Sequence, residues 1–469
     1  MKTYKDLLLY ALPACLGTML ATPLAAQPSE ATKRLLERIK MFEPAVIRIA
    51  ENVYTAIGYQ VSANSMIIGT DGVIIVDPGQ MPTAAGKVRV AFGEISPLPV
   101  RAIIYTHGHG DHTGGAPAFF EPERGIQVWA RENYGSEAAL VRSKGLAGGM
   151  RPSNTQGFDL PLEQRIGIGV AIPPERRPAG NMMRDGMQRG NQRAAGPGPR
   201  GVQPTHRFGE QRKALEIAGV RLELVAAPGE TADQLYVWLP DQRVVFAGDN
   251  FYQSWPNVYP LRGTARRSLR DWIASIDKMV GEDPLHVVGG HTAPILNEAK
   301  QVLTNYRDSM QWVLDRTLEG LSQFMTPDEL VQHTRLPERF AKLDYLADYY
   351  GSVEGTVRDL YAQDLGWFDG DPLSLHRESP MRQSERMADL AGGVDRLAAK
   401  AAEAMADDDP LGAAQLLRHV IRLRPQDRNS KRMMADALEI VAERTFNAPM
   451  RNYTLSSANR FRREAEEGR

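Results

Sequence analysis

The chain has 469 residues and a formal net charge of −1, from 56 basic and 57 acidic side chains, so no overall basic field is available to bind nucleic acid. Hydrophobic residues make up 42% and charged residues 24%, which excludes wholesale disorder, and the length predicts two or three domains. The one cysteine, Cys15, excludes an internal disulfide and a thiolate zinc site, so any metal site must use histidines and carboxylates.

Residues 1–26 have the pattern of an export signal. Two lysines precede an apolar stretch, residues 7–24, which prolines and a glycine interrupt too often for a membrane-spanning helix. Ala25 and Ala26 provide a cleavage point. A disordered or helical tail is the alternative. We predict export to the periplasm or the medium, with no stable membrane insertion once the signal is removed.

Residues 27–310 are predicted to form a first domain of packed sheets covered by helices. Short β-branched runs that end at glycine or proline indicate buried strands, and alternating runs indicate half-buried strands. The predicted strands are Val73–Asp77, Arg101–Thr106, Val220–Val225, Leu235–Leu239, Val244–Ala247 and Val287–Gly290.

One stretch of this domain, Arg176 to Arg212, has a different composition. It holds eight arginines and two acidic residues, with many glycines and prolines and little apolar periodicity. This composition predicts a long, flexible surface insertion. A solvated loop is the simpler interpretation, and a role in drawing anions toward a site is the alternative.

Residues 311–469 are predicted to form a helical domain. Apolar residues at helical spacing indicate helices over Pro327–His333, Val357–Gln363, Met387–Met405, Leu411–Leu423 and Ser430–Arg444. The last two resemble one helical hairpin of a tetratricopeptide-type repeat, and no second copy is present.

The strongest chemical signal is the segment 106–115, Thr-His-Gly-His-Gly-Asp-His-Thr-Gly-Gly, directly after a predicted strand. A turn there directs His107 and His109 one way and Asp111 and His112 another, which provides ligands for two adjacent cations. Imidazole and carboxylate are the usual zinc ligands where thiolates are absent.

Further ligands are expected at the ends of other strands. Glu230 lies in a Pro-Gly-Glu-Thr turn, Asp249 follows Ala-Gly, and His291 follows Gly-Gly. Each comes just after an apolar run, where a side chain projects into a shared site. Together with the histidine cluster they complete two cation sites, with Asp249 placed to bridge them.

These motifs resemble the metallo-β-lactamase superfamily, which implies an αβ/βα sandwich with a dinuclear site at one edge. Glu230 stands where that superfamily usually has histidine, and this departure is itself the pattern of the zinc-dependent alkylsulfatases. The segment 257–264, Asn-Val-Tyr-Pro-Leu-Arg-Gly-Thr, is similar to one in those enzymes. They commonly carry glutamate where this chain has Asp249.

The helical half also resembles the alkylsulfatases, through motifs similar to those of their dimerisation domain: Tyr349-Tyr350-Gly351-Ser352, residues 365–372 and Arg451-Asn452-Tyr453. We therefore expect a homodimer through this domain, because a single helical hairpin leaves an apolar face that needs a partner. A sterol-carrier-like domain is common in those enzymes, and we expect none in this sequence.

The resemblance implies a metal-dependent sulfuric ester hydrolase with two Zn²⁺ ions, acting on a small-molecule alkyl sulfate to release an alcohol and sulfate. His107, His109 and Glu230 would hold one ion, and Asp111, His112 and His291 the other, with Asp249 bridging. Asp111 and Asp249 are also candidate catalytic residues.

The alkylsulfatase-like segment supplies the candidate substrate-binding residues. Arg262 is the predicted sulfate clamp and a third catalytic residue, by its position in the motif. Asn257 and Tyr259 are predicted to bind substrate beside it. In the alternative interpretation, Arg262 pairs with a structural carboxylate. Another metallo-β-lactamase-fold hydrolase (a lactonase, a β-lactamase-like amidase or a phosphoesterase) is the alternative function.

Overall fold

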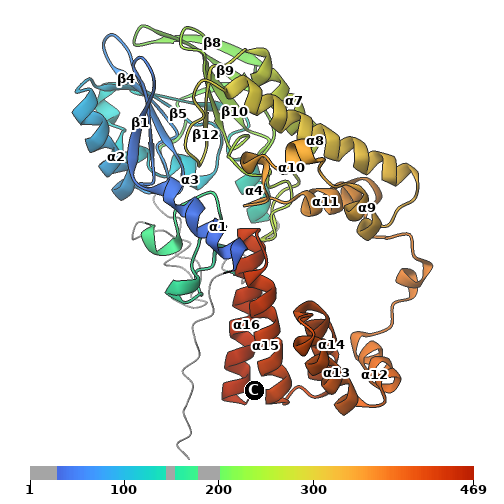
Figure 1. Cartoon of the computed structure of the whole chain (residues 1–469). Coiled ribbons are helices and arrows are strands. Elements are labelled where there is room, and N and C mark those ends of the chain that lie inside the picture. The colour runs from blue at the N-terminus through green and yellow to red at the C-terminus, as the bar shows by residue number, and fades with distance from the viewer. Residues whose placement is uncertain (1–28, 144–153, 178–200, 469) are drawn as a thin grey trace, which may run out of the picture.

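The computed structural model describes residues 29–143, 154–177 and 201–468. The predicted export signal, residues 1–26, lies outside these described residues. Two sheets face each other, helices cover their outer sides, and further helices extend from one end (Figure 1).

The first sheet has seven strands in chain order. The bounds are β1 (Ala45–Ala50), β2 (Val53–Ile57), β3 (Asn64–Ile68), β4 (Val73–Val76), β5 (Val100–Ile104), β6 (Gln127–Arg131) and β7 (His206–Phe208). Strands β1 to β4 pair antiparallel, and β4 to β7 pair parallel. The carboxyl ends of β4 and β5 therefore lie side by side, which places the segment that follows β5 next to the end of β4.

The second sheet has five strands, in the order β12-β11-β10-β9-β8. The bounds are β8 (Arg212–Ile217), β9 (Val220–Ala226), β10 (Leu235–Leu239), β11 (Val244–Gly248) and β12 (His286–Gly289). Only β11 and β12 pair parallel in this sheet, so their carboxyl ends also meet at one edge.

The sequence pattern of β4 explains how the sheets pack. Ile74 and Val76 join the core between the two sheets, whereas Val73 and Ile75 face the other way, against Val88 of the covering helix α2. Because both faces of β4 are buried, its sequence is a continuous apolar run and does not alternate between apolar and polar residues.

In the first part of the chain the helices are α1 (Glu30–Ile39), α2 (Pro82–Ile95), α3 (Gly110–Thr113), α4 (Ser136–Ser143), α7 (Leu269–Gly281) and α8 (Ala299–Ser322). Helix α2 covers the outer face of the first sheet, and α7 and α8 cover that of the second. Trp272 of α7 and Tyr306 of α8 belong to a core that includes Trp238 and Val287 of the second sheet.

The remaining helices are α9 (Pro327–His333), α10 (Glu338–Ala341), α11 (Val353–Leu365), α12 (Pro380–Ala391), α13 (Val394–Ala406), α14 (Pro410–Leu423), α15 (Arg428–Glu443) and α16 (Ala448–Glu467). The single helix expected over Met387–Met405 is wrong. Gly392 and Gly393 have φ angles of 87° and 113°, a conformation that favours glycine, and they separate α12 from α13.

The structure contains no break at residue 310, where the domain boundary was expected. Met310 lies within α8 and is fully buried. The core that it joins continues into Leu330 of α9 and Leu360 of α11. Helices α9 to α11 thus pack with the sandwich, and α12 to α14 lie apart from it (Figure 1).

Both ends of the stretch 176–212, expected as a flexible insertion, are ordered instead. Arg177 is buried. His206–Phe208 pairs with β6 as edge strand β7, and Arg212 begins β8, so strand pairing orders this end of the stretch. Residues 178–200 lie outside the described part of the chain.

Within the described residues, no helix combines the length and the apolar character that crossing a membrane requires.

Candidate metal centre and active site

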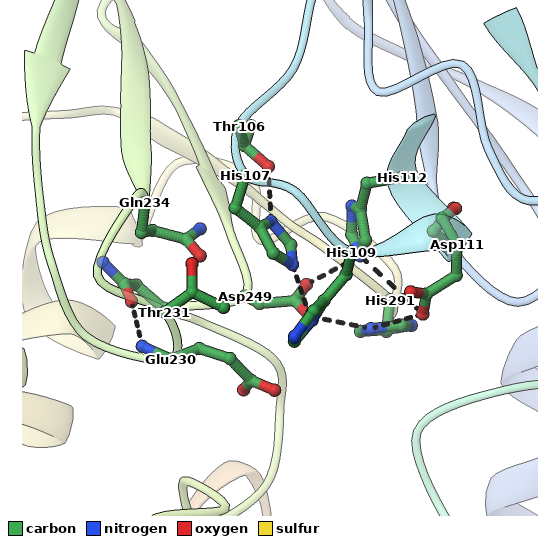
Figure 2. Close-up of polar contacts among 12 residues, drawn as sticks. Thr106, His107, His109, Asp111, His112, Glu230, Thr231, Gln234, Asp249 and His291 are labelled. Carbon is green, nitrogen blue, oxygen red and sulfur yellow. Dashed lines mark hydrogen bonds and ion pairs between the residues drawn. The ribbon is translucent and has the colours of Figure 1, made fainter. Parts of the chain in front are cut away.

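The seven predicted ligand residues come together at one edge of the sandwich, where strands of both sheets end (Figure 2). His107, His109, Asp111 and His112 lie in the segment after β5. Glu230, Asp249 and His291 follow β9, β11 and β12, respectively. The site is therefore built from four strand ends.

Asp249 lies at the centre of this arrangement (Figure 2). Its Oδ1 atom is 3.2 Å from Nε2 of His112, and its Oδ2 atom is 3.1 Å from Nε2 of His291 and 3.6 Å from Nε2 of His107. Burial disfavours the charged carboxylate, but His112 and His291 more than compensate and hold the pKa of Asp249 well below its usual range.

Hydrogen bonds from the scaffold orient three imidazoles toward Asp249. Their Nδ1 atoms are held by neighbouring oxygens: His112 by Asp77 (2.8 Å), His291 by the carbonyl of Val61 (3.0 Å) and His107 by the Thr106 hydroxyl (3.0 Å). Because Nδ1 is engaged in each ring, Nε2 is the atom presented to the centre of the site.

Asp77 fixes the base of the histidine cluster. Its carboxylate accepts hydrogen bonds from the backbone N–H of Thr106 at 2.8 Å and from the Thr106 hydroxyl at 2.7 Å, in addition to the contact with His112. Its φ of 52° is unusual for a residue other than glycine. Strained backbone of this kind persists where surrounding bonds over-determine it, and here it aims a carboxylate at the site.

Two glycines make room for the ligands that follow them. Gly248 has a φ of 56°, and a Cβ there would lie 2.6 Å from Oγ1 of Thr106. A Cβ on Gly290 would lie 1.7 Å from Oδ1 of Asp249. Glycine before Asp249 and before His291 therefore allows the ends of β11 and β12 to approach the neighbouring ligand residues closely.

Several atoms of the site are buried without a hydrogen-bond partner among the described residues: Nε2 of His107, Nε2 of His112 and Oδ1 of Asp249. Buried polar atoms rarely remain without partners. A cation bound between these atoms would satisfy all three.

Three sets of ligand atoms lie within 4.8 Å of one another: His107, His112 and Asp249; Asp111, His112 and His291; and His109, Glu230 and Asp249. The residues present thus fit a metal centre. Asp249 belongs to two of the three sets, one with His107 and His112 and the other with His109 and Glu230.

His109 and Glu230 are held by three residues that the sequence did not indicate. Oε1 of Glu137, in α4, lies 3.5 Å from Nε2 of His109. Burial disfavours the imidazolium, but this carboxylate raises the pKa of His109. Nη1 of Arg267 lies 2.8 Å from Oε1 of Glu230, and the Tyr252 hydroxyl donates to Oε2 at 3.1 Å.

The three predicted substrate-binding residues, Asn257, Tyr259 and Arg262, line one cavity together. Tyr259 is 47% exposed, whereas Asn257 is buried. Nη1 of Arg262 is 3.4 Å from the carbonyl of Gly263, a long hydrogen bond, and no carboxylate lies within ion-pair distance of Arg262 among the described residues. Arg262 thus does not form the structural ion pair of the alternative interpretation.

The first turn of α16 supplies another wall of this cavity, through Asn447, Pro449 and Met450. The Asn447 amide donates to the carbonyl of Tyr350 at 2.9 Å. Tyr350 also lines the cavity, and this hydrogen bond holds its backbone in place. The helical half therefore contributes directly to the candidate substrate site.

Arg451 and Asn452, expected in a dimerisation motif, bond within the chain. Asn452 Nδ2 donates to the carbonyl of Thr155 at 3.0 Å and of Gly167 at 2.6 Å. Arg451 Nη1 donates to the carbonyl of Gln164 at 2.9 Å. These bonds fasten residues 155–167 to α16 and thereby fix the part of the cavity wall that Thr155 provides.

One arginine of the expected insertion belongs to the site region. Arg177 is buried, its Nε donates to the carbonyl of Ile172 at 3.3 Å, and its guanidinium lies 5.3 Å from the Phe158 ring centroid. Burial lowers the pKa of Arg177 to about 10, and the negative charge of Asp111 opposes that shift. A buried positive charge therefore stands near the Asp111 side of the site.

The residues that contact the site but were not predicted from the sequence are Asp77, Glu137, Arg177, Tyr252 and Arg267. Asp77 carried a signal, since it ends a strand as Asp249 does. Glu137 and Arg267 have no such sequence signal, because only the folding of the chain brings them next to His109 and Glu230, respectively.

Two family descriptions match this chain. Residues 58–291 match the metallo-beta-lactamase superfamily, and residues 326–464 match alkyl sulfatase dimerisation. Together they cover most of the sandwich and most of the helical half.

Individual relatives agree with these matches. A linear primary-alkylsulfatase of a Pseudomonas species is 31% identical over 84% of this chain and 72% of its own length. An alkyl/aryl-sulfatase of Saccharomyces cerevisiae is 25% identical over 89% of this chain and 64% of its own length.

A solved structure, the stereoselective inverting sec-alkylsulfatase Pisa1 from Pseudomonas sp., superposes with a TM-score of 0.78 at 22% identity. The match covers 92% of this chain and 68% of that chain. The expected fold, an αβ/βα sandwich followed by a helical domain, is confirmed.

Proposed function

Because the chain belongs to the alkylsulfatase family of the metallo-β-lactamase superfamily, we propose that it hydrolyses alkyl sulfate esters to an alcohol and sulfate with the help of two zinc ions. The observation that carries the proposal is the set of imidazole and carboxylate atoms around Asp249, several of them buried without a hydrogen-bond partner among the described residues.

The ligands divide between the two sides of Asp249. His107, His109 and Glu230 would hold one ion, and Asp111, His112 and His291 would hold the other. Zinc, when bound, supplies the Lewis acidity that makes water a nucleophile near neutral pH and polarises the ester.

Asp111 is suited to orient the attacking water. Its side chain is 25% exposed, whereas that of Asp249 is 3% exposed, so it faces the open side of the site. Its Oδ2 atom lies 3.8 Å from Nε2 of His291. A carboxylate at this position can accept a hydrogen bond from water while it contacts a metal.

Arg262 is the proposed sulfate clamp, with Asn257 and Tyr259 beside it in the same cavity. A guanidinium presents two parallel N–H donors that match paired sulfate oxygens. Because no carboxylate among the described residues pairs with Arg262, its donors are available to an anionic substrate.

The test is a substrate panel. The zinc-loaded protein is incubated with alkyl sulfates of several chain lengths, phosphate monoesters, lactones and a β-lactam, and each product is assayed. We expect sulfate and alcohol from the alkyl sulfates at rates well above those for the other classes. Hydrolysis of a lactone, phosphoester or β-lactam in preference to every sulfate would instead establish the alternative function.

We also propose a homodimer, supported by the dimerisation match over residues 326–464. The segment between α11 and α12 exposes Trp367 (69%) and Leu373 (73%), a pattern that a partner subunit would cover. Sedimentation velocity at micromolar concentration should give twice the mass of the chain. A single species of about 52 kDa would contradict the dimer.

A further inference from the structure

Arg267 is a buried cation at the base of the site. Its side chain is 1% exposed, and Nη1 lies 2.8 Å from Oε1 of Glu230 and donates to the carbonyl of Asn257 at 2.8 Å. An isolated charge buried to this degree is very costly unless an opposite charge is close. Glu230 is that charge, and Glu137 stabilises the guanidinium from a second side.

The guanidinium is not saturated by protein groups. Its Nε and Nη2 atoms are buried and have no hydrogen-bond partner among the described residues. A purely structural arginine fully enclosed in a core would be expected to use more of its five donors. Its location is therefore better explained by the charge that it brings to the site.

The negative charge that Arg267 balances is local. Five carboxylates are connected to the site by direct contacts: Asp77, Asp111, Glu137, Glu230 and Asp249. Among the ion pairs of the described residues, Arg267 is the arginine that contacts Glu230. With histidine at position 230, the superfamily's usual residue, this carboxylate would be absent and Arg267 would lose the charge that it contacts.

We propose that Arg267 is the positioning residue that makes Glu230 a usable metal ligand, by holding Oε1 in place and by balancing the carboxylate's charge. This inference rests on the proposed two-metal site. Arg267 acts through Glu230, so its effect is on metal binding. Glu230 and Arg267 then act as a pair, and replacing either residue alone weakens metal binding.

The test is a double-mutant cycle read out as zinc bound per chain. Arg267→Met should reduce zinc from about two to about one equivalent, since Glu230 would be left without its counter-charge. Glu230→His alone leaves Arg267 buried without a partner, and should also lose zinc and lower the thermal midpoint of the metal-free protein. The double variant Glu230→His/Arg267→Met should recover two equivalents.

The exposed neighbour Arg266 provides the matched control, and Arg266→Met should bind zinc as the parent does. If Arg267→Met does not fold, Arg267→Lys is measured by competition with a chelator. The Arg267→Lys variant should bind its more weakly held zinc ion roughly 10- to 100-fold less tightly than the parent does, which is the usual loss of metal affinity when a residue that orients a ligand is changed. Chelator competition applies to every folded variant.

Two results would overturn the proposal: parental zinc affinity in the Arg267 variant that folds, or a double variant that binds zinc no better than Arg267→Met. A parent that binds two zinc ions but hydrolyses no sulfate ester would refute the proposed function and leave the Arg267 proposal standing. A parent that binds no zinc would refute both.

Discussion

The segment 106–115 and the helix α16 both build the site, but they do so differently. The segment carries four ligand residues within six positions, directly after β5, so its contribution is local. Helix α16 acts over long range, because Asn452 bonds to Thr155 and Gly167, nearly three hundred positions earlier in the chain. The comparison separates two tasks: nearby residues assemble the metal ligands, and distant residues shape the cavity beside them.

If the ligands around Asp249 bind metal together, removing the negative charge of Asp249 should abolish sulfate ester hydrolysis. Asp249→Asn keeps the size of the side chain but removes the carboxylate that contacts three imidazoles. We expect less than one zinc per chain by elemental analysis and a loss of roughly a thousandfold or more in sulfate release, since metal activation contributes several kcal/mol. Two bound zinc ions in this variant would show that Asp249 does not bridge.

Arg262 lies between the two regions, in the cavity but outside the ligand set. Arg262→Lys keeps the charge and loses the planar pair of donors. Turnover of an alkyl sulfate should fall roughly ten- to a thousandfold, the range for one preorganised donor, and Arg262→Ala should be worse. Zinc content and thermal midpoint should match the parent. Parental turnover in both variants would move the clamp elsewhere, with Arg177 the next candidate.

The long-range task can be disturbed without touching the ligands. Asn452→Ala leaves the carbonyls of Thr155 and Gly167 without their donor, which should cost about 1–3 kcal/mol for each buried group that finds no other partner. The cavity wall should loosen, so we expect a higher KM for alkyl sulfates with two zinc ions still bound. Arg460→Ala, an exposed site on the same helix, is the control. Loss of zinc from Asn452→Ala would mean that the two tasks are not separable.

A smaller effect concerns Asp348, whose carbonyl accepts a hydrogen bond from Asn447 at the start of α16. Burial raises the pKa of Asp348 from 3.8 to about 7. The folded state therefore holds a proton that the unfolded state releases between about pH 4 and 7, so this residue lowers stability as the pH rises through that window. Asp348→Asn should gain stability relative to the parent at pH 8 more than at pH 5.

Denaturant unfolding of the parent and of Asp348→Asn at pH 5 and pH 8 measures the difference in their free energies of unfolding at each pH. An equal difference at pH 5 and pH 8 would show that Asp348 is charged in the folded protein at both.

The same contrast explains what the sequence could predict. The strand ends that carry His107, Asp249 and His291 are visible as apolar runs that stop at glycine or a polar residue, because the hydrophobic pattern and the ligand lie next to each other in the chain. Arg267 and Asn452 have no such local signal, because their partners are brought to them by sheet pairing and helix docking.

Local backbone chemistry accounts for a second miss. The apolar spacing over Met387–Met405 is that of one helix, but two adjacent glycines with positive φ end α12 within it, and the apolar pattern alone does not show this. The boundary expected at residue 310 falls within α8, because a change in composition along the chain does not mark the end of a shared core.

We propose that sulfate ester hydrolysis depends on two zinc ions at the Asp249 site. The most direct test is a titration of metal-free protein with zinc, in which bound zinc and sulfate released from an alkyl sulfate are measured in the same samples. We predict that sulfate release rises with bound zinc and reaches its maximum at two equivalents per chain. Full sulfate release from protein that holds no metal, or none at two bound equivalents, would contradict the claim.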